Sequence, residues 1–169
     1  MNLKKIFCWP PFLGGIGAGV TISILSYITY ESILSGTNYG LWLAASFGSS
    51  VVVVFGYPTN EFAQPKNVIL GHLLCTLVGI IFVTLFKISQ DRSIFFLAIG
   101  LAVGIAVMLM MALRITHPPA GGNTIVVMLA QDSFQYLMFP IMVGAVTIII
   151  GGLIYNRFIL KKKYPTKWF

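Results

Sequence analysis

Residues 94–113 read IFFLAIGLAVGIAVMLMMAL, a run without a single charged side chain. An α-helix of about 20 apolar residues is long enough to cross the ~30 Å hydrocarbon core of a bilayer. Three further apolar stretches of similar length occupy 12–30, 68–88 and 136–160. The sequence therefore predicts an all-α fold, a polytopic transmembrane helical bundle with four full spans.

Two other apolar stretches do not fit a full span. Small and polar residues at 46 and 48–50 interrupt the stretch 39–57, and the stretch 123–130 is far too short to cross alone. We expect both to form short, broken or re-entrant helical segments that enter the membrane and stop.

The composition agrees with this class. The chain is 57% hydrophobic and only 9% charged, with a mean hydropathy of +0.91, whereas soluble domains are roughly 25% charged. The net charge of +7 comes mainly from Lys4, Lys5 and residues 157–167, which flank apolar segments. Basic residues in these positions are typical of anchors that face anionic lipid. The bilayer is therefore the expected partner, and nucleic acid is not.

The basic residues also predict an orientation. With six crossings, or with four and two re-entrant segments, nine lysines and arginines lie on one side and two on the other. The positive-inside rule places both termini in the cytoplasm in either case, and we expect the cytoplasmic (inner) membrane. The number of crossings, and hence inverted or parallel repeats, stays open.

Catalytic signals are lacking. Cys8 and Cys75 form no CxxC pair, and Glu61, Asp91 and Asp132 fall in predicted loops. The sequence contains no HExxH, phosphate-loop or Ser-His-Asp pattern. We expect neither an enzyme nor a metal or other cofactor.

The chain also shows a weak internal similarity. GSSVVVVF at 48–55 aligns with GNTIVVML at 122–129, and after one residue of slippage Gly71 and Gly79 align with Gly144 and Gly152. We predict one domain, 1–169, with repeats at about 12–88 and 94–160, a pattern typical of transporters. The simpler alternative is that glycine and valine are common in membrane helices.

The most specific local pattern is RITHPPAGGNT at 114–124. Proline disfavours helix at the preceding His117 and suits the first turn of a helix, so a helix should begin here. Free amides and the helix dipole at such a start favour anions, and Gly48 with the two serines at 49–50 suggests a second start. The predicted substrate-binding residues are Gly48, Ser49, Ser50, His117, Pro118, Gly121, Gly122, Asn123 and Thr124.

A second group of polar residues follows the first short segment. His72 lies on one face of a predicted span with Thr76, and an ionisable residue there indicates function, although a histidine bonded to a neighbouring helix is an equal alternative. The predicted vestibule or gating residues are Gln64, Lys66, Asn67, His72 and Arg114. As an alternative, the loop around Gln64 only caps the next helix, with Asn67 as its N-cap.

Four motifs in order carry a family resemblance: FGSS at 47–50, AQPKN at 63–67, GH at 71–72 and HPPAG at 117–121. Together they resemble the HPP family of small integral membrane proteins over about 12–160. The resemblance implies several membrane spans, and photosynthetic members of the family are implicated in nitrite transport.

These observations predict transport of a small monovalent inorganic anion, nitrite first, through a site between two half-helix N-termini. Two alternatives stay open: a channel for a neutral solute such as water, ammonia or nitrous acid, and a structural or regulatory membrane subunit. The glycine-rich helix faces would also suit a homo-oligomer.

Overall fold

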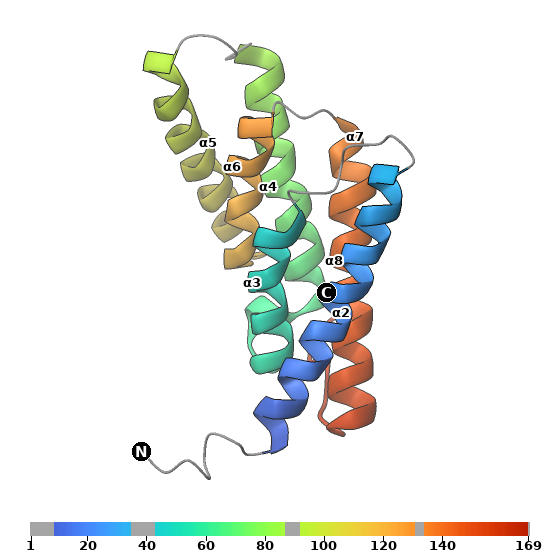
Figure 1. The fold of residues 1–169 in the computed structure, drawn as a ribbon. Helices are drawn as coiled ribbons and strands as arrows, with labels where there is room; N and C mark the ends of the chain where they lie inside the picture. The colour runs from blue at the N-terminus through green and yellow to red at the C-terminus, as the bar shows by residue number, and fades with distance from the viewer. Residues whose placement is uncertain (1–8, 35–42, 87–91, 131–133, 169) are drawn as a thin grey trace, which may run out of the picture.

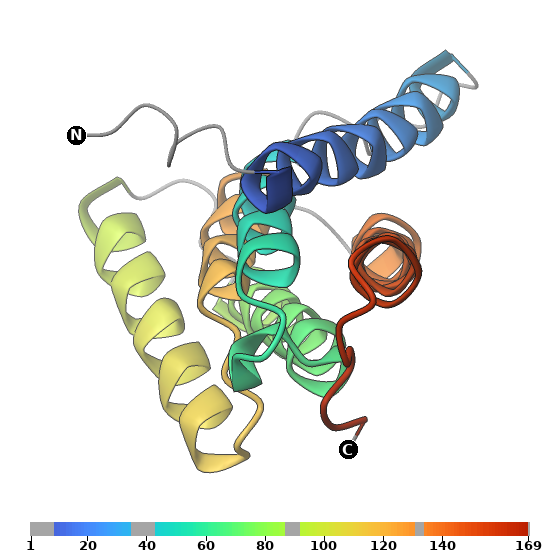
Figure 2. The same cartoon turned by 90° about the horizontal axis from the view of Figure 1, so that it is seen from below.

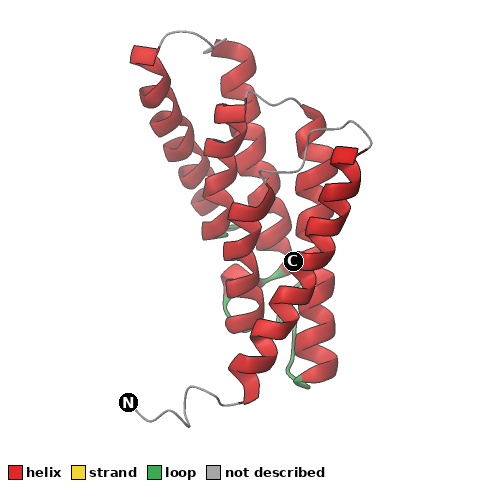
Figure 3. Ribbon diagram, viewed as in Figure 1, coloured by secondary structure: helices red, strands yellow, loops and turns green. Residues whose placement is uncertain are grey.

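The computed structural model describes residues 9–34, 43–86, 92–130 and 134–168. These residues form helices and connecting loops, with no strand among them (Figure 3). In chain order the elements are α2 (Trp9–Leu34), α3 (Leu43–Gly56), η1 (Glu61–Ala63), α4 (Pro65–Phe86), α5 (Arg92–Ala112), η2 (Pro118–Ala120), α6 (Gly121–Ala130), α7 (Phe134–Tyr136), η3 (Leu137–Met142), α8 (Val143–Leu153) and η4 (Ile154–Ile159).

Four helical segments are long and apolar enough to cross a membrane. They are Pro11–Glu31, Pro65–Thr84, Ile94–Ala112 and Phe134–Ile159, the last of which joins α7, η3, α8 and η4 into one continuous helix. The predicted all-α membrane bundle with four full spans is thus confirmed, and the chain is an integral membrane protein.

The two short helices occupy the centre of the bundle. Figure 2 shows α3 and α6 beside α4, with α2, α5 and α8 around them. At about 1.5 Å per residue, the 14 residues of α3 and the 10 of α6 fall well short of ~30 Å. In Figure 1, α3 descends from the middle of the molecule and α6 ascends from near its middle, so the two run in opposite directions.

Glycines on the long helices set how closely the short ones approach. A Cβ at Gly79 of α4 would collide with Val127 of α6, and a Cβ at Gly152 of α8 would collide with Val54 of α3. Val127 lies as far along the chain from Val54 as Gly152 lies from Gly79. Each short helix therefore packs closely on a long helix at a glycine.

The helix ends are shaped by specific local bonds. Arg114, with a φ of 53°, ends α5: its N–H donates to the Met111 carbonyl, and the N–H of Ile115 donates to Met110. This left-handed cap turns the chain sharply into the 115–120 loop. Within the last span, Pro140 lacks an N–H, and the helix widens there into the π-helical turn η3.

The C-terminal segment folds back onto the loop before α4. The Tyr164 hydroxyl donates to the Ala63 carbonyl at 2.8 Å, and the N–H of Thr166 donates to Oε1 of Gln64 at 2.8 Å. Burial raises the pKa of the Tyr164 phenol. Residues 161–167 are therefore held in place beside the 57–64 loop.

Some sequence predictions concern residues outside the described ranges. They are Lys4, Lys5, Cys8, Lys87, Asp91 and Asp132.

Candidate functional site

Five polar side chains from four elements meet inside the apolar bundle. Ser50 of α3, His72 and Thr76 of α4, His117 of the 115–120 loop and Asn123 of α6 are each at most 1% exposed. They form one hydrogen-bonded chain, which we call the central polar network. Such a group inside a membrane bundle is energetically unfavourable unless its members bond to one another.

Ser50 is the hub of the network. Its Oγ lies 2.8 Å from Nε2 of His72 and 2.9 Å from Nε2 of His117. The same hydroxyl lies 3.0 Å from the carbonyl of Ser46 in the preceding turn. The amide nitrogen of Asn123 lies 2.8 Å from Nδ1 of His72 and 3.2 Å from Oγ1 of Thr76.

Local structure brings His117 to this hub. The residue is extended, with φ −136° and ψ 96°, because Pro118 follows it. The 115–120 loop lies directly on α4 at Gly71, where a Cβ would be 2.9 Å from the Cβ of His117 and 3.2 Å from the Ile115 carbonyl. Glycine at position 71 is therefore required for the contact between the two histidine rings, whose centroids are 5.0 Å apart.

The hydrogen bonds also fix which atoms carry protons. The Phe62 carbonyl can only accept, so Nδ1 of neutral His117 donates to it at 2.7 Å and Nε2 accepts. Asn123 donates to Nδ1 of His72, so neutral His72 carries its proton on Nε2 and donates to Ser50. Ser50 accepts from His72 and donates its one hydrogen to His117, so in this neutral state the Ser46 carbonyl at 3.0 Å is a second acceptor within its reach.

With both histidine rings neutral, only this direction of donation gives every hydrogen bond of the network one donor and one acceptor. If the Asn123 amide were turned over, His72 would carry its proton on Nδ1. The Ser50 hydroxyl would then face two unprotonated Nε2 atoms with one hydrogen. The donors therefore point one way, from Asn123 through His72 and Ser50 to His117.

The chain enters α6 through two prolines and a tight turn. Pro118 and Pro119 have no N–H, the N–H of Ala120 donates to the His117 carbonyl, and that of Gly121 donates back into η2. None of the amides at 118–121 is therefore free, and an anion site on the amides of 122–124 stays a prediction. Thr124 is buried and donates to the Cys75 carbonyl at 2.8 Å, a contact that joins α6 to α4.

The predicted helix start at Gly48–Ser50 is wrong. The helix begins at Leu43 and runs unbroken to Gly56, so these residues lie within it. Because consecutive residues of a helix point in different directions, Ser50 is fully buried, whereas its neighbour Ser49 is exposed. Added Cβ atoms at Gly48 and Gly121 would meet nothing within 4 Å, which leaves open space beside both short helices.

Of the predicted vestibule residues, His72 belongs to the central polar network, and the other four are of two kinds. Gln64 and Asn67 are buried and bond to backbone: Gln64 donates to the carbonyls of Pro58 and Asn60, and Asn67 donates to that of Thr116. These three bonds hold the loops in place. Lys66 is half-buried in the first turn of α4, and Arg114 is exposed at the end of α5.

Sequence reasoning missed several partners of the network. The Phe62 and Ser46 carbonyls come from the backbone, which no motif reveals, and the Phe47 ring lies 4.8 Å from the His72 ring. For Thr76 the sequence did carry a signal, because Thr76 follows His72 by one helical turn and so lies on the same face of the helix. Elsewhere, no three His, Cys, Asp or Glu side chains gather as a metal site in the ranges that the structure describes.

Comparison with known proteins places the chain in a family. A family model described as "HPP, transmembrane region" matches residues 7–165. Two transmembrane proteins of Dictyostelium discoideum are similar: one is 33% identical over 152 residues, 87% of this chain and 52% of the relative, and the other is 34% identical over 154 residues, 88% and 48%. The chain thus spans about half the length of these curated relatives, and no solved structure matches it. Because the family model covers nearly the whole chain and the four motifs stand in order, this chain belongs to the HPP family of transmembrane proteins.

Proposed function

We propose that the chain transports a small monovalent anion, nitrite first among candidates, together with one proton. The observation that supports this proposal is the Ser50 hydroxyl bonded to two buried histidines, at 2.8 and 2.9 Å. The proposal is for a transporter rather than an enzyme.

The network has no evident role in holding single helices. Hydroxyls that serve only their own helix bond four residues back, as Thr21 does to Gly17 and Thr147 to Val143. The network instead joins α3, α4, α6 and the loop before α6. An ionisable group inside a membrane bundle indicates function by default, and here two are joined.

The network can accept one proton by turning a single hydroxyl. A proton added to Nε2 of His117 makes that atom a donor to Ser50. The Ser50 hydrogen then turns to the Ser46 carbonyl, which lies 3.0 Å away. Ser50 accepts from both rings, and each bond of the network is again satisfied.

The charge of the protonated network supports an anion as the partner. The side chains that bond the two imidazoles are hydroxyl and amide groups, with no carboxylate among them. A proton on His117 would therefore leave an uncompensated positive charge in a low-dielectric interior, which a small anion would neutralise. We propose that the anion approaches beside Gly48 and Gly121, where space is open, and that Lys66 and Arg114 attract it.

The arrangement of the helices supports an alternating-access carrier built from two inverted halves. We propose that α2, α3 and α4 form one half and α5, α6 and the 134–159 helix the other. The equivalent glycine contacts and the opposite directions of α3 and α6 support this division. Inverted halves with a site between them are typical of secondary transporters. We further propose that both termini face the cytoplasm, since most basic residues lie at that end.

The test is uptake of nitrite, nitrate, formate and chloride into liposomes that hold the purified protein, at two pH values and with an imposed potential. We expect nitrite uptake above that of empty liposomes, faster with acid outside and insensitive to potential, because anion and proton move together. Uptake that follows the potential would instead indicate a bare anion. Permeation of water or ammonia alone would indicate a neutral channel, and no flux of any solute would indicate a structural or regulatory subunit.

A further inference from the structure

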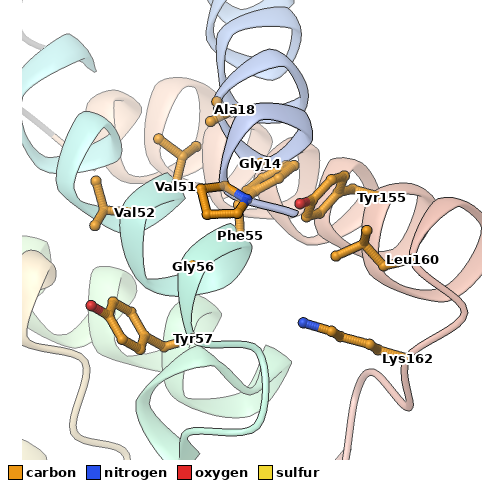
Figure 4. A pocket seen from close by; sticks show the side chains of 12 residues that line it. Gly14, Ala18, Val51, Val52, Phe55, Gly56, Tyr57, Tyr155, Leu160 and Lys162 are labelled. Atoms are coloured by element: carbon orange, nitrogen blue, oxygen red, sulfur yellow. The ribbon is translucent and has the colours of Figure 1, made fainter. Parts of the chain in front are cut away.

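A second feature lies away from the central polar network, at the end of the bundle where α2 begins. A cavity of about 450 Å³ opens there between α2, the end of α3 and the C-terminal segment (Figure 4). Its volume falls within the roughly 300–1,000 Å³ range of ligand pockets. The network does not line it, so it needs a separate explanation.

Most of the residues that line the cavity are small or apolar. On α2 they are formed by small residues, among them Gly14, Gly15 and Ala18, and on α3 by apolar side chains such as Val52 and Phe55. From Pro11 to Ala18 the cavity follows α2 for about 10 Å, starting at the end of the membrane span. The cavity therefore lies beside the first turns of a helix that is long and apolar enough to cross a membrane.

A lysine is held at the mouth of this cavity. Lys161 adopts a φ of 53°, which turns the chain, and the N–H of Lys162 donates to the Asn156 carbonyl at 2.8 Å. The bond from Tyr164 to the Ala63 carbonyl fixes the next turn of the segment. Figure 4 shows the Lys162 amine extended into the opening on the side of Gly56 and Tyr57.

We propose that this cavity binds one anionic phospholipid. The ammonium of Lys162 would bind the lipid phosphate, and the upper part of one acyl chain would lie along Gly15 and Ala18. Charge complementarity supports a lipid with net negative charge, because a lysine near a membrane surface contributes favourably to binding anionic lipid. This site does not depend on the proposed transport function.

The structure provides two matched pairs of variants. Lys162→Ala removes the lining lysine, and Lys163→Ala removes an exposed lysine outside the lining. Gly15→Leu fills the cavity, and Gly19→Leu places the same side chain one turn further along α2, outside it. An added Cβ at either glycine would meet nothing within 4 Å, so neither change strains the helix packing.

The experiment is native mass spectrometry of the detergent-purified full chain with phosphatidylglycerol and phosphatidylcholine of identical acyl chains. We expect the wild type to prefer phosphatidylglycerol, Lys162→Ala to lower that preference about fivefold, and Gly15→Leu to lower the binding of both lipids. The control variants should match the wild type. Equal lipid binding by all variants would overturn the proposal. So would a Lys162→Ala protein that melts earlier but keeps its preference, because Lys162 would then contribute only to the stability of the fold.

Discussion

Replacing Ser50 by alanine should disable the central polar network at its hub. The change removes the hydroxyl that bonds to His72 at 2.8 Å and to His117 at 2.9 Å, and leaves both Nε2 atoms buried without that partner. Interhelical hydrogen bonds in membrane proteins contribute about 0.6 kcal/mol on average and up to ~1.7 kcal/mol. The two bonds together predict a loss of about 1–3 kcal/mol in the free energy of unfolding.

Two assays test this prediction. At roughly 2–4 °C per kcal/mol for a chain of this size, the thermal midpoint in detergent should fall by about 2–12 °C. Acid-driven nitrite uptake into liposomes should fall by about tenfold or more, because the hydroxyl that turns when the network takes up a proton is gone; a tenfold loss corresponds to a barrier higher by ~1.4 kcal/mol.

The neighbouring Ser49 provides the control for both assays. Its side chain is exposed on the same helix, so Ser49→Ala should retain the wild-type midpoint and uptake. If Ser50→Ala behaves like Ser49→Ala in both assays, the network contributes neither stability nor transport. If it lowers only the midpoint, the network is structural and the proposed proton pathway is wrong.

Three further predictions follow from the packing and the bonds. Nitrogen-15 NMR at neutral pH should find His117 protonated on Nδ1 and His72 on Nε2, and two rings with the same tautomer would refute the direction of the network. Gly152→Ala should destabilise the protein by about 1–3 kcal/mol because its methyl collides with α3, whereas Gly100→Ala, which meets nothing within 4 Å, should not; equal thermal midpoints would contradict the helix contact. Because burial raises the pKa of Tyr164 above its unfolded value near 10, stability should fall as pH rises above about 10, and Tyr164→Phe should remove this decline while lowering stability at neutral pH by about 1 kcal/mol; a pH-melting series of both proteins tests the difference.

The sequence by itself determined the class of the protein. Run length and hydropathy are local properties, so the uncharged stretch 94–113 and its three counterparts were sufficient to predict four spans. The HPPAG stretch likewise predicted the helix that starts beside it, because proline restricts its own backbone and that of the residue before it. The family followed from four short motifs in order.

Only the tertiary structure decided what the polar residues do. Gly48 looked like a helix start, but the packing of α3 against α2 and α8 keeps the helix continuous from Leu43. Ser50 bonds to residues 22 and 67 positions away, and neither distance leaves a periodic trace in the sequence. The approach of His117 depends on Gly71 lacking a side chain, and the direction of its proton depends on the Phe62 carbonyl. Hydropathy along the chain thus determines which segments enter the membrane, whereas contacts between distant segments determine which polar groups meet there.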